Sequence, residues 1–494
     1  MSVTRRQTLS LLGAMPGVAM ALGQPIHKVR RTDVVVIGSG AAGLAAAIEA
    51  RKQHKKVILI EKMGTTGGNS SLSAGAISVP NTPLQTIHGI TDSVEQMVQD
   101  IMLAGYVSHR DRVRTLCQNA YDTWRWTEQE LGVKWHPRII EKEYGHSCAR
   151  TLHLANRSGS GLIYPMTARA QALGVEIRLH TAFTHFLQNH KNRIIGVRYR
   201  NAQGDIQQIM TKCGVVLASG GFGADPSFSQ MQNWRLSEQV GTTNQPGATS
   251  ETIREAYRVG AWVVHAQYIH CIPETSPDEN GWGQVWEFTR YCTCTQGIWV
   301  VQETGKRFVN ELESNVNRTN AILDLVMNQQ NALAIADAKA VEQPSSLIVH
   351  REDIAELVTR GFIYEYETLR DLAVDFSIPL TALQEEIEQY NQDVQSGVRL
   401  DSMSRPVQPE ARPMSKGPWY VSRVLPKVMQ CTGGVVINTD AQVLSVTNDQ
   451  PIPNFYAAGE ITGGIHGISQ LGAMGLIDAL VFGRIAGQKV CQNG

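Results

Sequence analysis

The sequence has no excess of either charge and, beyond its N-terminus, no long apolar run. Lys plus Arg and Asp plus Glu number 45 each in 494 residues, so the broad basic surface that nucleic acid needs is missing. No segment approaches the roughly 20 consecutive apolar residues of a membrane-spanning helix. We therefore expect neither a nucleic-acid partner nor a membrane-spanning chain. The length exceeds the ~250–300 residues at which single cores stop growing, which predicts two domains.

The chain also lacks the cysteine spacings that hold metals. Its eight cysteines are scattered, with neither a C-x-x-C pair nor a C-x-x-C-H haem attachment site among them. No metal and no bound haem are therefore expected.

The first 30 residues have the layout of an export signal. Arg5 and Arg6 form a basic pair, an apolar stretch follows, and Ala19-Met20-Ala21 offers small residues for cleavage. Gly13 and Pro16 interrupt the apolar stretch. This arrangement predicts a signal peptide of the twin-arginine type and a periplasmic location.

The strongest motif is "DVVVIGSGAAGLAAAIEARKQHKKVILIEK", which begins at Asp33. It contains a β-branched run, three glycines in the spacing G-x-G-x-x-G, an alanine-rich helical stretch and a second apolar run that ends at an acid. This is the dinucleotide-binding fingerprint in its required strand, turn, helix and strand context. The expected ligand-contacting residues are Gly38, Ser39, Gly40, Ala41, Ala42, Gly43, Glu61 and Lys62.

In this fingerprint each residue has a physical task. Gly38 permits the turn, Gly40 lets the backbone approach a pyrophosphate, and Gly43 allows the helix to pack closely on the strand. The phosphates face the helix N-terminus, and Glu61 accepts hydrogen bonds from the ribose. By itself, the fingerprint does not distinguish FAD from NAD.

Further glycine-rich turns resolve this choice. They occur in "GGNSSLSAGA", in "GVVLASGGFGAD" and in "NFYAAGEITGGIHG". Together with "TGKRFVNE" and "LIDALVFGRIAG", they resemble the flavin domain of the family of soluble fumarate reductase, flavocytochrome c, urocanate reductase and the 3-ketosteroid dehydrogenases. The resemblance covers nearly the whole chain from residue 31 and implies FAD as the cofactor. It adds the expected FAD contacts Gly68, Asn69, Ser70, Gly75, Ala76, Ser219, Gly220, Gly459, Glu460, Gly475 and Leu476.

The resemblance also implies the fold. We expect an α/β protein with a discontinuous, Rossmann-like FAD-binding domain formed by residues 31–268 and 429–494. Residues 269–428 form an inserted α+β capping domain over the flavin. Helical spacing of apolar residues in "LTALQEEIEQYNQDVQSG" is compatible with this division.

The resemblance is weakest where the relatives bind their dicarboxylate. The arginine that clamps a substrate carboxylate corresponds to Gln470, and the proton-donating arginine corresponds to Asn315. The two histidines correspond to Met429 and Ile272, although His270 lies only two residues from the second. A buried carboxylate left without its cation costs about 3–5 kcal/mol, so fumarate is not the expected substrate. Gln470 can donate and accept hydrogen bonds, or it packs against the flavin edge.

Several residues remain as candidates for proton transfer near the flavin. They are Tyr420, Cys431, His466, Glu313 and Arg318, and with Gln470 and Asn315 they complete the candidate catalytic set. Tyr420 follows a stretch that enters the flavin domain in relatives, but a tyrosine between apolar residues is more often part of a core. Arg290 is a possible replacement anion anchor or a solvated surface residue.

The sequence therefore predicts an exported FAD-dependent oxidoreductase that acts on CH–CH groups. The expected reaction is hydride transfer from flavin N5 to an activated C=C bond of a small, non-dicarboxylate substrate. Because the chain has no haem site and no second complete nucleotide fingerprint, the expected electron donor is external, either a quinol dehydrogenase or a cytochrome c. The alternatives are a dehydrogenase of the 3-ketosteroid type and a non-catalytic flavin electron carrier.

Overall fold

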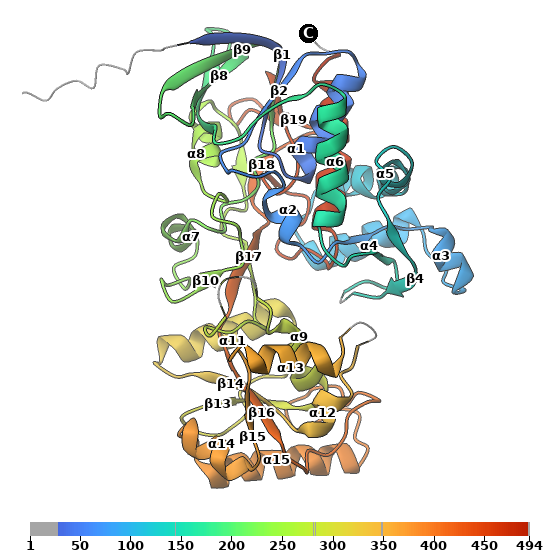
Figure 1. Ribbon diagram of the computed structural model, residues 1–494, viewed down its shortest axis with the longest axis vertical. Coiled ribbons are helices and arrows are strands. Elements are labelled where there is room, and N and C mark those ends of the chain that lie inside the picture. Colours follow the sequence, from blue (N-terminus) through green and yellow to red (C-terminus); the bar gives the residue numbers. More distant parts are fainter. Residues whose placement is uncertain (1–27, 144, 280, 282, 347–348, 493–494) are drawn as a thin grey trace, which may run out of the picture.

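The computed structural model describes residues 28–143, 145–279, 281, 283–346 and 349–492. Residues 1–27 of the predicted signal peptide lie outside this range. Figure 1 shows a larger body that contains both ends of the described chain and a smaller body built from its middle. Within the described ranges, no helix is long and apolar enough to cross a membrane.

A mainly parallel sheet forms the centre of the larger body. Strand β1 lies between β2 and β9, parallel to both, and its residues Val34 to Ile37 are buried on both faces, as expected for a sheet covered by helices. The order is β19-β20-β9-β1-β2-β6, with β8 and β7 attached beside β9. The strands are β1 Val29–Ile37, β2 Val57–Ile60, β6 Glu176–Arg178, β7 Ala182–Gln188, β8 Ile194–Arg200, β9 Ile206–Leu217, β19 Gln442–Leu444 and β20 Pro451–Ala457.

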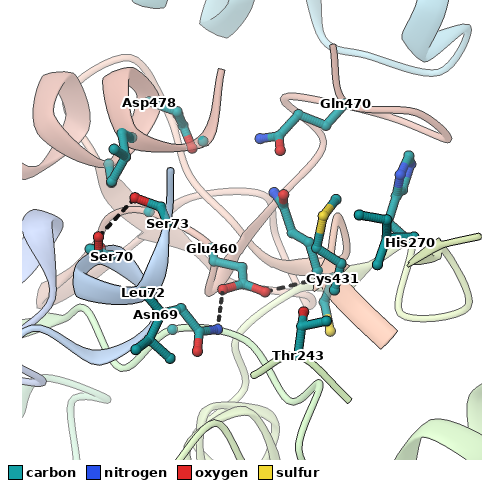
Figure 2. Close-up of a pocket in the computed structure, with 18 of the residues that line it drawn as sticks. Asn69, Ser70, Leu72, Ser73, Thr243, His270, Cys431, Glu460, Gln470 and Asp478 are labelled. Atoms are coloured by element: carbon teal, nitrogen blue, oxygen red, sulfur yellow. Dashed lines mark hydrogen bonds between the residues drawn. The ribbon is translucent and has the colours of Figure 1, made fainter. Parts of the chain in front are cut away.

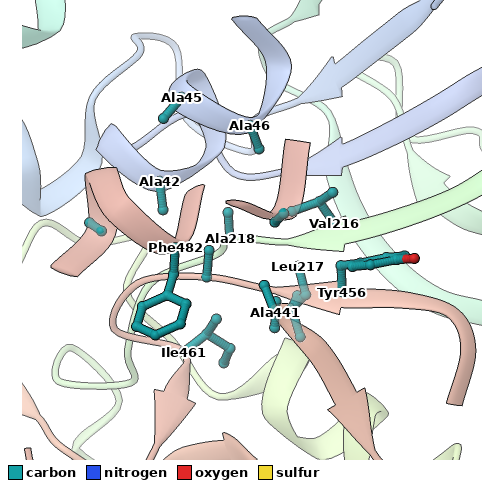
Figure 3. Packing of buried hydrophobic residues seen from close by; sticks show 14 of the residues in the cluster. Ala42, Ala45, Ala46, Val216, Leu217, Ala218, Ala441, Tyr456, Ile461 and Phe482 are labelled. Atoms are coloured by element: carbon teal, nitrogen blue, oxygen red, sulfur yellow. The ribbon is translucent and has the colours of Figure 1, made fainter. Parts of the chain in front are cut away.

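Helices α1 (Ala41–Lys52) and α16 (Gly475–Lys489) pack together over this sheet through small residues. Figure 3 shows Ala42, Ala45 and Ala46 of α1 facing α16 and the strands beneath. A Cβ atom at Gly483 would lie 2.5 Å from the carbonyl oxygen of Ala42, and one at Gly487 would lie 2.3 Å from that of Ala46. Glycine at these positions is therefore what allows the two helices to approach so closely.

The remaining elements of the larger body cover its sides. A small antiparallel sheet consists of β3 (Ala76–Ser78), β5 (Thr151–Leu154) and β4 (Trp135–Glu141). The helices are α2 Gly68–Leu72, α3 Pro83–Ile87, α4 Val94–Gly105, α5 Arg110–Gln129, α6 Ser160–Ala172, α7 Pro226–Gln232 and α8 Glu251–Arg258.

The smaller body is an antiparallel sheet, in the order β13-β14-β16-β15, with helices around it (Figure 1). Its strands are β13 Ile298–Val301, β14 Ala332–Ala336, β15 Tyr364–Tyr366 and β16 Trp419–Val424. Its helices are α9 Trp286–Phe288, the π-helix η1 Thr289–Thr293, α10 Cys294–Gln296, α11 Asn315–Met327, α12 Ala338–Glu342, α13 Arg351–Thr359, α14 Leu369–Asp375 and α15 Leu380–Gln395.

Two three-stranded sheets complete the fold. In the first, β17 (Lys427–Cys431) pairs with β10 (Gly241–Thr242) and β12 (Ile269–Ile272); the second contains β11 (Val263–Val264), β18 (Gly434–Val436) and β21 (Thr462–Gly463). Figure 1 shows β10 and β17 between the two bodies. The α/β class with an inserted α+β cap is confirmed. The limits at residues 269 and 428, which fall in β12 and β17, stay a prediction.

Candidate functional site

The carboxyl ends of four parallel strands meet at one edge of the main sheet. Strands β1, β2, β9 and β20 lead directly into Gly38, Glu61, Ser219 and Gly459. These residues line a cavity of about 1320 Å³, which also reaches residues of the smaller body. Ligand pockets commonly measure ~300–1,000 Å³, so this cavity has room for a dinucleotide and a small substrate together. Its place at the strand ends is where α/β sheets bind their ligands.

The fingerprint glycines have the geometry that their sequence positions require. Gly38 has a positive φ of 97°, and a Cβ atom at Gly43 would lie 2.0 Å from the carbonyl oxygen of Gly38. Gly40 is the N-cap of α1 and offers no side chain to the helix terminus, and the first turn contains no acidic residue. The α1 N-terminus therefore presents its backbone amides and positive dipole end to an anion such as a pyrophosphate.

Glu61 is held where a ribose-binding acid is needed. Its Oε2 accepts hydrogen bonds from the backbone amide and hydroxyl of Ser39, at 3.0 and 2.6 Å, and its Oε1 accepts one from Met63 N at 2.9 Å. A carboxylate has about four lone-pair positions, so Glu61 retains capacity for a ligand hydroxyl. Nearby, the Lys62 ammonium group donates to Thr249 and pairs with Glu251 at 3.3 Å.

Nearly all of the residues expected to contact FAD line this one cavity. Gly43 and Gly75 are not among them: Gly43 packs on the β1 turn, and a Cβ atom at Gly75 would meet Leu154 and Ser158 at 2.8 Å. Those that line it are Gly38, Ser39, Gly40, Ala41, Ala42, Glu61, Lys62, Gly68, Asn69, Ser70, Ala76, Ser219, Gly220, Gly459, Glu460, Gly475 and Leu476.

Glu460 lies between Asn69, which is among the expected FAD contacts, and Cys431 at the end of β17. Figure 2 shows its carboxylate between the side chain of Asn69 and the backbone of Cys431. It accepts from Cys431 N at 3.0 Å and lies 3.5 Å from Asn69 Nδ2. Burial raises the pKa of Glu460 above its usual range, although these donors oppose the shift.

Six of the seven candidate catalytic residues line the same cavity. They are Gln470, Asn315, Cys431, His466, Glu313 and Arg318. In the described part of the chain, Gln470 Nε2 has no hydrogen-bond partner, and Figure 2 shows this amide directed into the space above Glu460. His466 Nε2 lies 3.4 Å from an oxygen of Asp478. Burial raises the pKa of the Cys431 thiol well above its ordinary value, so this group stays protonated.

The structure places Tyr420 elsewhere. It lies in β16, where it pairs with Ala336 of β14 and Glu365 of β15, and its side chain is buried with Phe288 and Val341. Tyr420 does not line the cavity. Its expected catalytic role therefore has no support from the geometry, because β16 directs the ring into the layer beneath α12 and α13.

The positions of the two missing histidines also lie on the cavity wall. Met429 and Ile272 both line it. His270 precedes Ile272 by two residues in β12 and lines the cavity as well. His270 Nε2 donates to the carbonyl oxygen of Ile468 at 3.2 Å, and burial lowers the pKa of the ring. The neutral imidazole of His270 therefore lies two residues before Ile272, the position at which the relatives have a histidine.

A cation, Arg318, lies close to residue 315 on the cavity wall. It lies one helical turn after Asn315 in α11, so the two side chains share a face. Arg318 Nη2 donates to Asn315 Oδ1 at 2.6 Å and to Glu274 Oε1 at 2.5 Å. Burial opposes the charge of Arg318, but the Glu274 carboxylate outweighs it and raises the pKa. The guanidinium group thus remains charged at the cavity wall.

Several cavity residues were not expected from the sequence. They are Glu274, Glu143 and Tyr291, which come from three distant segments. Glu274 follows Ile272 by two residues, and this spacing is the only sequence signal that could have indicated it. Burial raises the pKa of the Tyr291 hydroxyl to about 12, so it too stays protonated. In the described residues, no group of three or more His, Cys, Asp or Glu is placed to hold a metal ion.

The fold and the cavity together are those of an FAD-binding oxidoreductase. The family model described as "FAD binding domain" matches residues 33–476, which is most of the chain. The chain belongs to this family, and FAD is its cofactor.

Curated relatives and solved structures agree with this assignment. The acrylate reductase flavoprotein subunit of Shewanella woodyi is 34% identical over 99% of this chain and 98% of its own length. The urocanate reductase of Eggerthella lenta is 32% identical over 92% of this chain and 74% of its own length. Among solved structures, the open conformation of a flavocytochrome c3 fumarate reductase matches with a TM-score of 0.81 and 28% identity, covering 94% of this chain and 78% of the other.

The raised pKa of Glu460 leads to a prediction about stability and pH. Since the folded protein favours the protonated acid, the free energy of unfolding falls as the pH rises from about 4.5 through the folded pKa. Glu460→Gln cannot titrate and keeps an acceptor for Cys431 N. We expect its stability, relative to the unchanged protein, to increase as the pH rises, measured as the thermal midpoint between pH 4 and 8.

The matched control is Glu385→Gln, which changes an exposed glutamate of α15. Its midpoint is expected to follow that of the unchanged protein at every pH. Parallel curves for Glu460→Gln and the unchanged protein would contradict the assignment of this dependence to Glu460.

Proposed function

We propose that this protein reduces the activated C=C bond of a small substrate that is not a dicarboxylate. The observation that carries the proposal is the Arg318–Asn315–Glu274 cluster, which supplies a charged proton donor to the cavity wall that faces the FAD cradle. The named activity of the acrylate reductase subunit supports the proposal, because acrylate carries one carboxylate.

In the proposed reaction the double bond receives a hydride and a proton. FAD, once bound and reduced by the external donor, would supply the hydride from N5. Arg318 holds the proton, and Glu274 fixes the guanidinium group by a charge-assisted hydrogen bond of 2.5 Å. Asn315 accepts a second bond from the same nitrogen, which orients the planar group further. Gln470 has an unengaged amide nitrogen at the cavity and offers a hydrogen bond to the activating carbonyl or carboxylate.

The Arg318–Glu274 ion pair on the cavity wall favours the reductase over the alternative of a flavin carrier that has lost its substrate site. A carrier has no need of a buried ion pair at the cavity, since such a pair costs desolvation free energy without a use. Here the Arg318 and Glu274 side chains are only 7% and 4% exposed and still line the cavity. The solved 3-ketosteroid dehydrogenases are 22% and 20% identical to this chain and share its fold.

We further propose that the protein acts in the periplasm and receives electrons from a separate redox protein. The basic pair Arg5-Arg6 and the small residues Ala19-Met20-Ala21 support export by the twin-arginine route. The acrylate reductase relative is named as a flavoprotein subunit, which supports a separate electron-delivering partner here, either a quinol dehydrogenase or a cytochrome c.

An anaerobic assay tests the function directly. The FAD-loaded protein is mixed with reduced methyl viologen and with acrylate, urocanate, an uncharged enone or fumarate. We expect turnover with acrylate and a kcat/KM at least about 100-fold lower for fumarate, because an uncompensated carboxylate costs about 3 kcal/mol or more. Equal turnover of fumarate, or no turnover with any acceptor, would contradict the proposal.

The proton-donor role predicts the effect of Arg318→Lys. Lysine keeps the charge but loses the fork that binds Glu274 and Asn315 together. We expect kcat with acrylate to fall about 100-fold, the usual minimum for a lost general acid, while KM changes less than about threefold. The measurement is steady-state kinetics with reduced methyl viologen.

The control for this variant is Arg307→Lys, in a second buried ion pair of the cap. Arg307 Nη2 lies 2.7 Å from Glu311 and 2.9 Å from Asp401, and Arg307 does not line the cavity. We expect Arg318→Lys and Arg307→Lys to lower the stability by a similar amount. Only Arg318→Lys is expected to lower kcat. Unaltered kcat in Arg318→Lys would rule out Arg318 as the donor.

The export proposal predicts that replacing both Arg5 and Arg6 by lysine retains the precursor in the cytoplasm. Cell fractionation followed by immunoblotting measures the distribution. The control replaces Arg30 and Arg31, beyond the cleavage signal, by lysine. Normal delivery of the Arg5/Arg6 variant to the periplasm would refute the twin-arginine route.

A further inference from the structure

Arg290 is a cavity cation that the proposed reaction does not use. It lies in the π-helix η1 (Thr289–Thr293), and π-helical turns occur frequently at functional sites. In and beside this π-helix, the residues that line the cavity are Trp286, Glu287, Arg290, Tyr291 and Cys294.

The Arg290 guanidinium group is positioned to take another ligand. Its Nη2 donates to Glu143 Oε2 at 3.1 Å, and the group lies 5.7 Å from the centre of the Tyr291 ring. Glu143 is its only hydrogen-bond partner among the described residues, and 38% of the Arg290 side chain is exposed. Arg318, by contrast, is 7% exposed and bound to Glu274. Arg290 therefore retains donors that can reach a carboxylate in the cavity.

Glu143 connects Arg290 to the loop that contains Gln470. A Cβ atom at Gly472 would lie 3.0 Å from Glu143 Oε2, the same oxygen that accepts from Arg290. Gly472 is two residues after Gln470, and both line the cavity. Where the relatives have an arginine, this chain has Gln470. The nearby cation here is Arg290, which approaches the Gln470 loop from the capping segment.

Several acidic side chains lie near Arg290, and their charge favours a substrate with one carboxylate over a substrate with two. Glu143 is its direct partner, and Glu141 pairs with His153 at 2.9 Å. Glu287 is a further acid on this wall. A second substrate carboxylate near these acids would meet like charge, which disfavours binding.

We propose that Arg290 binds the single carboxylate of a 2-enoate monocarboxylate and that Glu143 excludes dicarboxylates. This inference rests on the proposed reductase function and names its substrate class. The carboxylate accepts hydrogen bonds from the Arg290 nitrogens that Glu143 does not engage. Glu143 competes for the same guanidinium group and so weakens, but does not prevent, binding of a monoanion.

Calorimetric titration of the oxidised, FAD-loaded protein tests this anchor without any turnover. Acrylate is compared with acrylamide, its uncharged amide of nearly the same shape. In Arg290→Gln, the Kd for acrylate is expected to rise at least tenfold, whereas the Kd for acrylamide changes less than twofold. The control is Arg423→Gln, which removes an arginine of similar exposure, 45%, whose partner Asp278 lies at 2.6 Å, away from the cavity lining.

The Glu143→Gln variant provides a test of opposite sign. Removal of the competing carboxylate is expected to lower the Kd for acrylate at least threefold and to make fumarate binding measurable. A residue that only maintained the shape of the cavity would weaken both ligands when changed, so the two variants together separate anchoring from a structural role.

Three results would overturn the anchor: acrylate binding to Arg290→Gln as tightly as to the unchanged protein, equal loss of acrylate and acrylamide, or no acrylate binding to the unchanged protein. Failure of the reductase proposal is distinguishable from these. In that case the titrations follow the expected pattern while the methyl viologen assay shows no turnover.

Discussion

Helices α1 and α16 approach each other through glycine and alanine, and this contact sets the positions of both ends of the cavity. The backbone of α1 at Ala42 and Ala46 is so near α16 that Gly483 and Gly487 have no space for a Cβ atom. Because α1 begins at the fingerprint turn and α16 begins at Gly475, directly after the Gln470 loop, one packing contact holds the fingerprint turn and the Gln470 loop in fixed relation. Interiors packed at this density do not deform continuously, so the cavity between the turns has a defined shape.

The two sides of the cavity differ in charge: one side binds FAD, and the other contains Arg318 and Arg290. The FAD side presents backbone amides and a helix N-terminus, with Glu61 already held by Ser39. The opposite wall presents two arginines in different states. Arg318 is buried and fixed by Glu274, as a residue that must hold a proton in one orientation requires, whereas Arg290 is partly exposed and shares its carboxylate partner with a loop. A buried charge is retained only where it is paired, which explains why Arg318 lies against Glu274.

The FAD side could be predicted from the sequence because its information is local. Gly38, Gly40 and Glu61 lie within one strand, turn, helix and strand unit, and the later glycine turns follow strands that end at the same sheet edge. The substrate wall could not be predicted to the same extent. Asn315 correctly marked a position on the cavity, but its new partner Arg318 depends on the start of α11, and Glu274 and Glu143 come from segments more than 40 residues away in sequence. Tyr420 lies away from the cavity for a related reason: the sequence does not reveal that β16 belongs to the sheet of the smaller body, and no described residue of β16 lines the cavity.

In our proposal, this cavity holds one substrate carboxylate at Arg290 and presents the substrate C=C bond to Arg318. The most direct measurement is a crystal structure of the oxidised, FAD-loaded protein with acrylate bound. We expect the acrylate carboxylate within hydrogen-bonding distance of the Arg290 guanidinium group and the double bond between the flavin and Arg318. A carboxylate bound at Arg318, or acrylate bound outside this cavity, would contradict it.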